Sequence, residues 1–160
     1  MTDVEARPSV VGLFHGGVSV SDLDRSLVFY VDLLGLEVAV QRDATDQYLR
    51  DIHGLPFSQV RMAFLRVPNS DTMVELLEYQ GVEHHPLTYL PSDPATGHLC
   101  FFVADVSALH RRLQAAGYQA RSAEPIEITA GPNKGARVIY TADPDGYPVE
   151  LLQRRPDPYD

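Results

Sequence analysis

Apolar residues recur along two stretches of the chain at the spacing of an amphipathic helix. The first stretch runs from Asp22 to Leu34 and the second from Ser107 to Ala116. Each places its apolar side chains on one stripe with a period of about 3.6 residues. Gly35 and Gly117 follow the two stretches, and glycine readily ends a helix in the left-handed conformation. We therefore expect two helices, each with one buried face and a glycine at its end.

Shorter runs rich in Val, Ile, Leu and aromatic residues predict strands. They lie at Glu37–Gln41, Gln59–Arg66, Thr72–Tyr79, Tyr118–Arg121, Ala136–Thr141 and Tyr147–Leu152. Asp143-Pro144-Asp145-Gly146 offers a proline that fixes φ and a glycine that accepts positive φ, so it predicts a tight turn, and Pro68–Asp71 predicts its counterpart. A short helix is expected at Gln47–Ile52, within the segment Asp43–Ser58.

The order of these elements repeats. A histidine opens a short β-like run at His15 and again at His98. Asp22 and Asp105, which start the two helical stretches, are separated by the same number of residues as the two histidines. Each half ends on Val-Glu-Leu-Leu, the first containing Glu75 and the second Glu150. The chain therefore predicts an α+β fold of two tandem βαβββ modules, at residues 9–80 and 98–153, with a linker at 81–97, a flexible tail at 154–160 and an insertion at 43–58 in the first module.

Composition narrows the classes of function. The chain has 160 residues, 44% of them hydrophobic, which is enough to bury a sizeable core. With 13 basic and 22 acidic residues and no basic cluster, it lacks the phosphate-neutralising surface that nucleic-acid binding requires. The segment Met1–Pro8 lacks the order of a secretory signal, and no apolar run is long enough for a bilayer, so we expect a cytoplasmic protein without membrane contact. Cys100 is expected to be a buried, inert thiol.

Two histidines and two glutamates are the candidate metal ligands. Glu75 and Glu150 lie in otherwise apolar strands, where an inward-pointing carboxylate needs a partner because an isolated buried charge is costly. Taken singly, such a glutamate usually faces solvent, and a strand histidine is usually a satisfied core or surface group. Their matched recurrence with His15 and His98 favours a site of two nitrogen and two oxygen donors, which suits one divalent transition metal ion.

At these residues the sequence resembles the vicinal oxygen chelate superfamily, which includes glyoxalase I, methylmalonyl-CoA epimerase, extradiol dioxygenases and bleomycin resistance proteins. The strongest matches are Val20–Leu27, Leu34-Gly35-Leu36, Gly97-His98, Val103–Val106 and the run from Asp143 to Leu151. The resemblance implies a cupped mixed sheet around a metal bound by His15, Glu75, His98 and Glu150, and a homodimer. The complete ligand set is similar to that of glyoxalase I.

The resemblance also implies a reaction. A small substrate with adjacent oxygens would chelate the metal, which stabilises an enediolate or enolate as a neighbouring carbon loses its proton. Glu150 is the first candidate for the general base and Glu75 the second, in a lyase, isomerase or epimerase. The metal could be Ni, Co, Zn, Fe or Mn. Two alternatives stay open: an iron-dependent extradiol-type dioxygenase, and a drug- or metabolite-binding protein without catalysis.

Other residues are candidates for the substrate cavity because they lie in the insertion or the linker, where enzymes of one fold vary. They are Tyr48, His53, His84, His85 and Tyr89. Lys134, in the loop Gly131–Gly135, could contact an anion, although the loop is expected to be a plain turn and lacks a phosphate-loop pattern. His110 is expected to face solvent.

Overall fold

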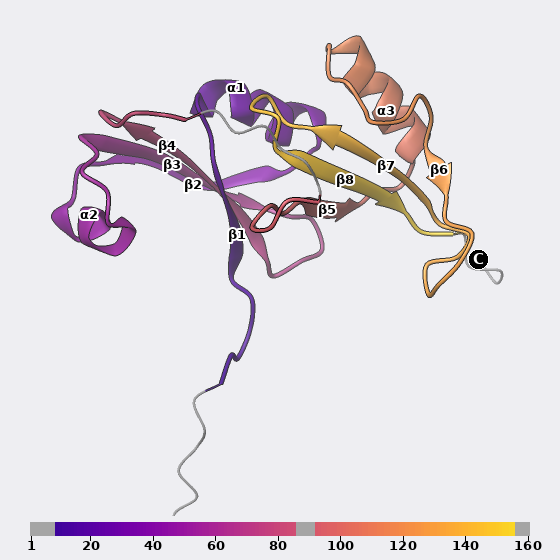
Figure 1. Ribbon diagram of the computed structural model, residues 1–160, viewed down its shortest axis with the longest axis horizontal. Helices are drawn as coiled ribbons and strands as arrows, with labels where there is room; N and C mark the ends of the chain where they lie inside the picture. Colours follow the sequence, from indigo (N-terminus) through magenta and orange to yellow (C-terminus); the bar gives the residue numbers. More distant parts are fainter. Residues whose placement is uncertain (1–8, 86–91, 156–160) are drawn as a thin grey trace, which may run out of the picture.

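Two halves of similar construction make up the computed structural model, which describes residues 9–85 and 92–155 (Figure 1). The first half contains β1 (His15–Ser19), α1 (Leu23–Leu27), η1 (Val28–Leu33), β2 (Glu37–Ala44), α2 (Gln47–His53), β3 (Gln59–Arg66) and β4 (Met73–Gln80). The second contains β5 (Leu99–Phe102), α3 (Val106–Ala115), β6 (Ile126–Glu127), β7 (Arg137–Ala142) and β8 (Pro148–Gln153).

Each half forms its own four-stranded mixed sheet, in the orders β1-β4-β3-β2 and β5-β8-β7-β6. The first strand of each sheet pairs in parallel with the last strand, and the remaining pairs are antiparallel. This arrangement confirms the predicted α+β fold of βαβββ units. The short helix predicted at Gln47–Ile52 is present as α2, between β2 and β3.

The helices α1 and α3 each begin with two hydrogen bonds of the same kind. Asp22 accepts a bond from the backbone N–H of Arg25, as Asp105 does from that of Ala108. Such N-caps satisfy backbone donors that have no partner within the helix. The last strand of each half supplies a further acceptor: Glu78 bonds to the backbone N–H of Leu23, and Gln153 to that of Val106. These bonds attach each helix to its own sheet.

The first helical stretch differs from the regular α-helix that its periodicity predicts. After Leu27 it widens into the π-helix η1, in which the backbone N–H of Leu34 bonds to the carbonyl of Phe29. A wider turn brings two consecutive residues to the same face, and Phe29 and Tyr30 are both fully buried. Gly35 then ends the stretch at φ 84°, as predicted.

One hydrophobic core joins the two halves. It combines Phe29, Leu65 and Leu76 of the first half with Leu113 and Leu151 of the second. The β7–β8 turn lies beside α1, where Asp145 accepts bonds from Ser21 and Arg25 (Figure 1). The helix-bearing faces of the two sheets therefore belong to a single hydrophobic interior.

A buried polar contact lies within this core. The Tyr30 hydroxyl donates a hydrogen bond to Asp143 Oδ2 across 3.1 Å, and Asp143 Oδ1 accepts the backbone N–H groups of Asp145 and Tyr147. Burial raises the pKa of both the Tyr30 phenol and the Asp143 carboxyl. The contact fixes the predicted turn, in which Gly146 has φ 89°.

Two expectations for the second half are wrong. Tyr118–Arg121 is not a strand, because only Ala120 forms a bridge, to Thr141, and the edge strand β6 lies further along at Ile126–Glu127. His110 is only 2% exposed instead of facing solvent. Its Nε2 lies 3.1 Å from the carbonyl oxygen of Ala123, so the segment between α3 and β6 folds over the ring and supplies its polar partner.

Several expectations concern residues that the structure does not describe. The N-terminal segment Met1–Pro8, the linker residue Tyr89 and the tail residues 156–160 lie outside the described ranges. Within those ranges, no helix has the length and apolar character needed to cross a membrane.

We predict that Tyr30→Phe lowers the free energy of unfolding by about 1–3 kcal/mol, because it leaves a buried Asp143 oxygen without its donor. Urea denaturation monitored by circular dichroism measures the change. The control is Tyr118→Phe, which removes a hydroxyl from a ring that also packs on Phe29. Equal, small effects of the two substitutions would contradict the importance of the Tyr30–Asp143 bond.

Candidate metal centre

The first histidine and the first glutamate meet on the face of their sheet opposite the core. Parallel pairing of β1 with β4 sets Gly17 beside Glu75, and His15 lies two residues earlier on the same face. His15 Nε2 is 3.2 Å from Glu75 Oε2. Phe14 and Phe64 pack edge-on against the imidazole, with ring centroids 4.9 and 5.4 Å away. His15 Nδ1 is buried and has no hydrogen-bond partner within residues 9–85 and 92–155.

The second histidine and glutamate form a corresponding pair. His98 directly precedes β5, Cys100 stands beside Glu150 in the register, and His98 Nε2 is 3.0 Å from Glu150 Oε2. The Tyr140 hydroxyl donates to Glu150 Oε2 across 2.8 Å and lies 3.2 Å from His98 Nε2. Burial and the neighbouring carboxylate raise the pKa of Tyr140 to about 12, so the phenol stays protonated at neutral pH and remains a donor.

Tyr140 is a site residue that the sequence reasoning missed. Antiparallel pairing places it opposite Glu150, as it places Phe64 opposite Glu75. Both rings contact the histidine of their pair edge-on, at 5.3 and 5.4 Å between centroids. The turn Asp143–Gly146 was the available signal, because counting back from it through the hairpin register leads from Glu150 to Tyr140.

The four predicted ligands come together as two pairs and not as one cluster. Among residues 9–85 and 92–155, no group of three or more His, Cys, Asp or Glu side chains is arranged to hold a metal ion. The first strands of the two sheets do approach each other, since a Cβ atom on Gly16 would lie 3.1 Å from Leu99 Cδ2. The described part of one chain thus contains two separate His–Glu pairs.

The expectation of a buried Cys100 is wrong. β5 is the edge strand of its sheet, and Cys100 is exposed on the face that presents Glu150. Partial burial of the thiol and the adjacent Glu150 carboxylate raise the pKa of Cys100 to about 11. The thiol is therefore almost entirely protonated at neutral pH, which makes it a poor nucleophile.

The predicted cavity residues divide into two groups. His53 Nδ1 is 2.5 Å from the Tyr79 hydroxyl, and His84 Nε2 is 3.0 Å from the Tyr79 carbonyl oxygen, so insertion and linker meet at the end of β4. Tyr48 on α2 is exposed and takes no part in this contact; its hydroxyl lies 3.5 Å from Arg42 Nη2. The loop holding Lys134 is a turn, as expected, with Gly131 and Gly135 at positive φ.

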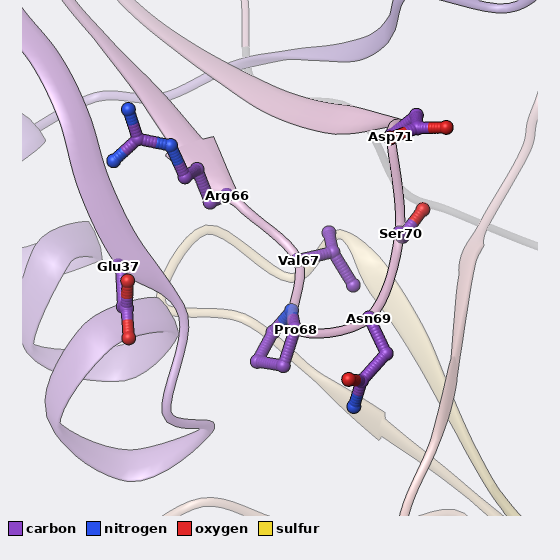
Figure 2. Close-up of a pocket in the computed structure, with 7 residues that line it drawn as sticks. All are labelled: Glu37, Arg66, Val67, Pro68, Asn69, Ser70 and Asp71. Atoms are coloured by element: carbon purple, nitrogen blue, oxygen red, sulfur yellow. The ribbon is translucent and has the colours of Figure 1, made fainter.

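A separate hollow lies at the β3–β4 turn. Figure 2 shows its lining, which consists of Glu37, Arg66 and the turn residues Val67 to Asp71. Its volume is about 450 Å³. None of its lining residues belongs to the two His–Glu pairs, so the hollow is a feature of the turn and not of the candidate metal centre.

Comparison with known families agrees with this architecture. Residues 12–151 match the model of the Glyoxalase/Bleomycin resistance protein/Dioxygenase superfamily, which covers both halves and both His–Glu pairs. The chain belongs to this superfamily. The resemblance inferred from its motifs is therefore confirmed.

Relatives within the superfamily are lyases and epimerases. The chain is 33% identical to a 2-epi-5-epi-valiolone epimerase from an Actinomyces species, over 91% of this chain and 80% of that protein. It is 33% identical to an ethylmalonyl-CoA/methylmalonyl-CoA epimerase from Cereibacter sphaeroides, over 88% of this chain and 96% of that protein. A lactoylglutathione lyase from Arabidopsis thaliana is 30% identical over 90% of this chain, which spans only 44% of that longer protein.

Among solved structures of the superfamily, a glyoxalase family protein from Bacillus cereus superposes with a TM-score of 0.79. The match covers 94% of this chain and 99% of that protein, at 19% sequence identity. At this identity the likeness establishes the fold alone.

Proposed function

We propose that the protein is a divalent-metal-dependent isomerase or lyase that moves a proton at a carbon next to a carbonyl group. Its ligands are His15, Glu75, His98 and Glu150, and its substrate is a small molecule with adjacent oxygens. The observation that carries the proposal is the repeated His–Glu pair, found at matching strand positions in both halves.

The geometry of each pair suits a metal ion. Metal bonds of about 2.1 Å to nitrogen and oxygen, at angles of about 90–110°, set neighbouring donor atoms about 3.0–3.4 Å apart. The Nε2–Oε2 separations of 3.2 and 3.0 Å fall in this range. Each pair therefore fits two adjacent coordination positions, and the mixture of imidazole and carboxylate donors suits a first-row transition metal.

The separation of the two pairs within one chain supports a four-ligand centre shared between two copies. We propose that the first pair of one copy joins the second pair of its partner, so that a twofold dimer contains two equivalent sites. The exposed aromatic residues beside the pairs support this arrangement: Phe14 is 63% exposed next to His15, and Phe102 is 61% exposed on β5.

A divalent ion held by these residues would act as a Lewis acid toward the substrate oxygens and favour loss of the neighbouring proton. Glu150 is the first candidate to accept that proton, and the Tyr140 hydroxyl orients its carboxylate. Glu75, which faces the Phe64 ring instead of a hydroxyl, is the second. His15 and His98 would hold the ion through imidazole nitrogens.

We predict about one transition-metal ion per chain in untagged protein, measured by elemental mass spectrometry. His98→Ala and Glu150→Ala each remove ligand atoms and should lose most of the metal. Glu127→Ala, at an exposed position on β6, is the control and should retain it. If wild-type protein neither retains metal nor regains it from added Ni²⁺, Co²⁺, Zn²⁺, Mn²⁺ or anaerobic Fe²⁺, the metalloenzyme proposal fails.

A mixing experiment tests the shared site. We predict that the double variants His15→Ala/Glu75→Ala and His98→Ala/Glu150→Ala each bind no metal alone. Unfolded and refolded together, they should recover about a quarter of the wild-type content, because half of randomly paired dimers are mixed and each mixed dimer has one intact site. Separate refolding followed by mixing without exchange is the control. A site formed within one chain would give no recovery.

Solvent exchange tests the chemistry. In D₂O, we predict that the metal-loaded protein introduces deuterium at the carbon next to the carbonyl of its substrate. A suitable panel contains the methylglyoxal–glutathione hemithioacetal, methylmalonyl-CoA and an inosose. Glu150→Gln should slow exchange by about 10²–10⁴-fold at saturating metal, whereas the exposed substitution Glu83→Gln should not. Undiminished exchange in both Glu150→Gln and Glu75→Gln would exclude these carboxylates as the base.

A further inference from the structure

A cleft opens beside the first His–Glu pair. It has a volume of about 610 Å³, which is in the range of small-molecule sites. β1 contributes one wall through Gly17 and Ser19, β4 contributes Tyr79, and the linker contributes His84. The second half closes the cleft with Asp145 and Tyr147.

The cleft begins at a proposed metal ligand. Gly17 lines it, and a Cβ atom on Gly17 would lie 3.6 Å from Glu75 Oε2. Tyr79 lies four residues after Glu75 on β4, so both side chains project from the same face of the strand. In the second half, the position beside Glu150 is taken by Cys100, which carries a side chain. The missing side chain at Gly17 thus leaves open space next to Glu75.

The cleft is lined by the apolar residues Val18 and Val20 and by a set of hydroxyls and imidazoles together with one carboxylate. Ser19 and Tyr79 offer hydroxyl groups, and His84 offers an imidazole whose Nε2 lies 3.0 Å from the Tyr79 carbonyl oxygen. Asp145 adds a carboxylate that bonds to Ser21 and pairs with Arg25. Because Arg25 balances this carboxylate and the described residues that line the cleft include no lysine or arginine, the cleft offers no strong cation to an anionic ligand. Hydroxyl groups on a neutral ligand, in contrast, can both donate to and accept from these side chains.

The Tyr79 hydroxyl is held in a fixed direction. It bonds to His53 Nδ1 at the end of α2, where Gly54 ends the helix in the left-handed conformation. The His53 and Tyr79 rings pack edge-on at 5.4 Å, and Phe57 contacts both. Burial, with a smaller effect of Glu75, raises the pKa of Tyr79. The phenol therefore remains a neutral hydroxyl that His53 orients, on a residue that lines the cleft.

We infer that this cleft binds the uncharged, polyhydroxylated part of the substrate, with Tyr79 as a specificity-determining residue and His53 as the residue that positions it. The substrate class is a neutral polyhydroxy ketone, such as a cyclitol or sugar ketone, and not a thioester or thioether of an anionic carrier. The inference rests on the proposed function in taking Glu75 as part of the reacting centre.

The test compares three probes by NMR titration of chelator-treated, full-length protein: an inosose, S-lactoylglutathione and methylmalonyl-CoA. We expect the inosose to bind and Tyr79→Phe to weaken it by about tenfold, the effect of one lost hydrogen bond. His53→Ala should weaken binding in the same direction, and His53→Asn, which keeps a hydrogen-bonding atom near the place of Nδ1, should recover part of it. Tyr48→Phe, on the same insertion, is the matched control.

Metal content and the urea midpoint of each variant are measured in parallel and should not change. Preferred binding of either anionic probe, or inosose binding that Tyr79→Phe leaves unchanged, would overturn the inference. Metal binding and solvent exchange on an anionic substrate would then still support the proposed function. If the protein binds no metal but its affinity for the inosose depends on Tyr79, the inference about the cleft is supported and the proposed metal-dependent function is contradicted.

Discussion

Sheet geometry is the constraint on which the candidate centre depends. Successive side chains of a strand point to opposite faces, and the helix-bearing face of each sheet is used by the shared core. Leu76 and Leu151 fill that core, which directs their neighbours Glu75 and Glu150 to the other face. Parallel pairing with β1 and β5 then brings a histidine to each carboxylate. The His–Glu pairs are therefore a consequence of how the halves pack.

The two His–Glu pairs occupy corresponding strand positions, but their neighbouring residues differ chemically. Phe64 faces Glu75, whereas Tyr140 faces Glu150 and bonds to it. Gly17 leaves space beside Glu75, whereas Cys100 occupies that place beside Glu150. The first pair is the more open of the two, because Phe64 has no hydroxyl and Gly17 has no side chain. This difference is the reason why we propose that the first half binds the substrate body and that the second half controls the proton.

Much of the fold follows from local pattern, because helix and strand periodicity, the Asp residues that begin the helices and the glycines that end them act over a few residues. What the pattern missed depends on contacts distant in sequence. The π-helix follows from burying both Phe29 and Tyr30 against the second half. His110 is buried because a later segment covers it, and Cys100 is exposed because β5 is an edge strand. The four candidate ligands were visible in the repeat, but Tyr140 required the hairpin register.

The separation of the two pairs also has a physical reason. Within one chain the halves are joined through their helix-bearing faces, with Tyr30 and Asp143 buried at the contact and Asp145 bound to Ser21. That packing uses the helix-bearing face of both sheets, whereas the opposite face of the first sheet carries Glu75 together with a second, smaller hydrophobic cluster that includes Phe57 and Leu77. A second copy can meet the faces with histidine and glutamate without disturbing the core. In the dimer that we propose, the packing that stabilises the single chain would therefore be kept while the two pairs from different copies meet.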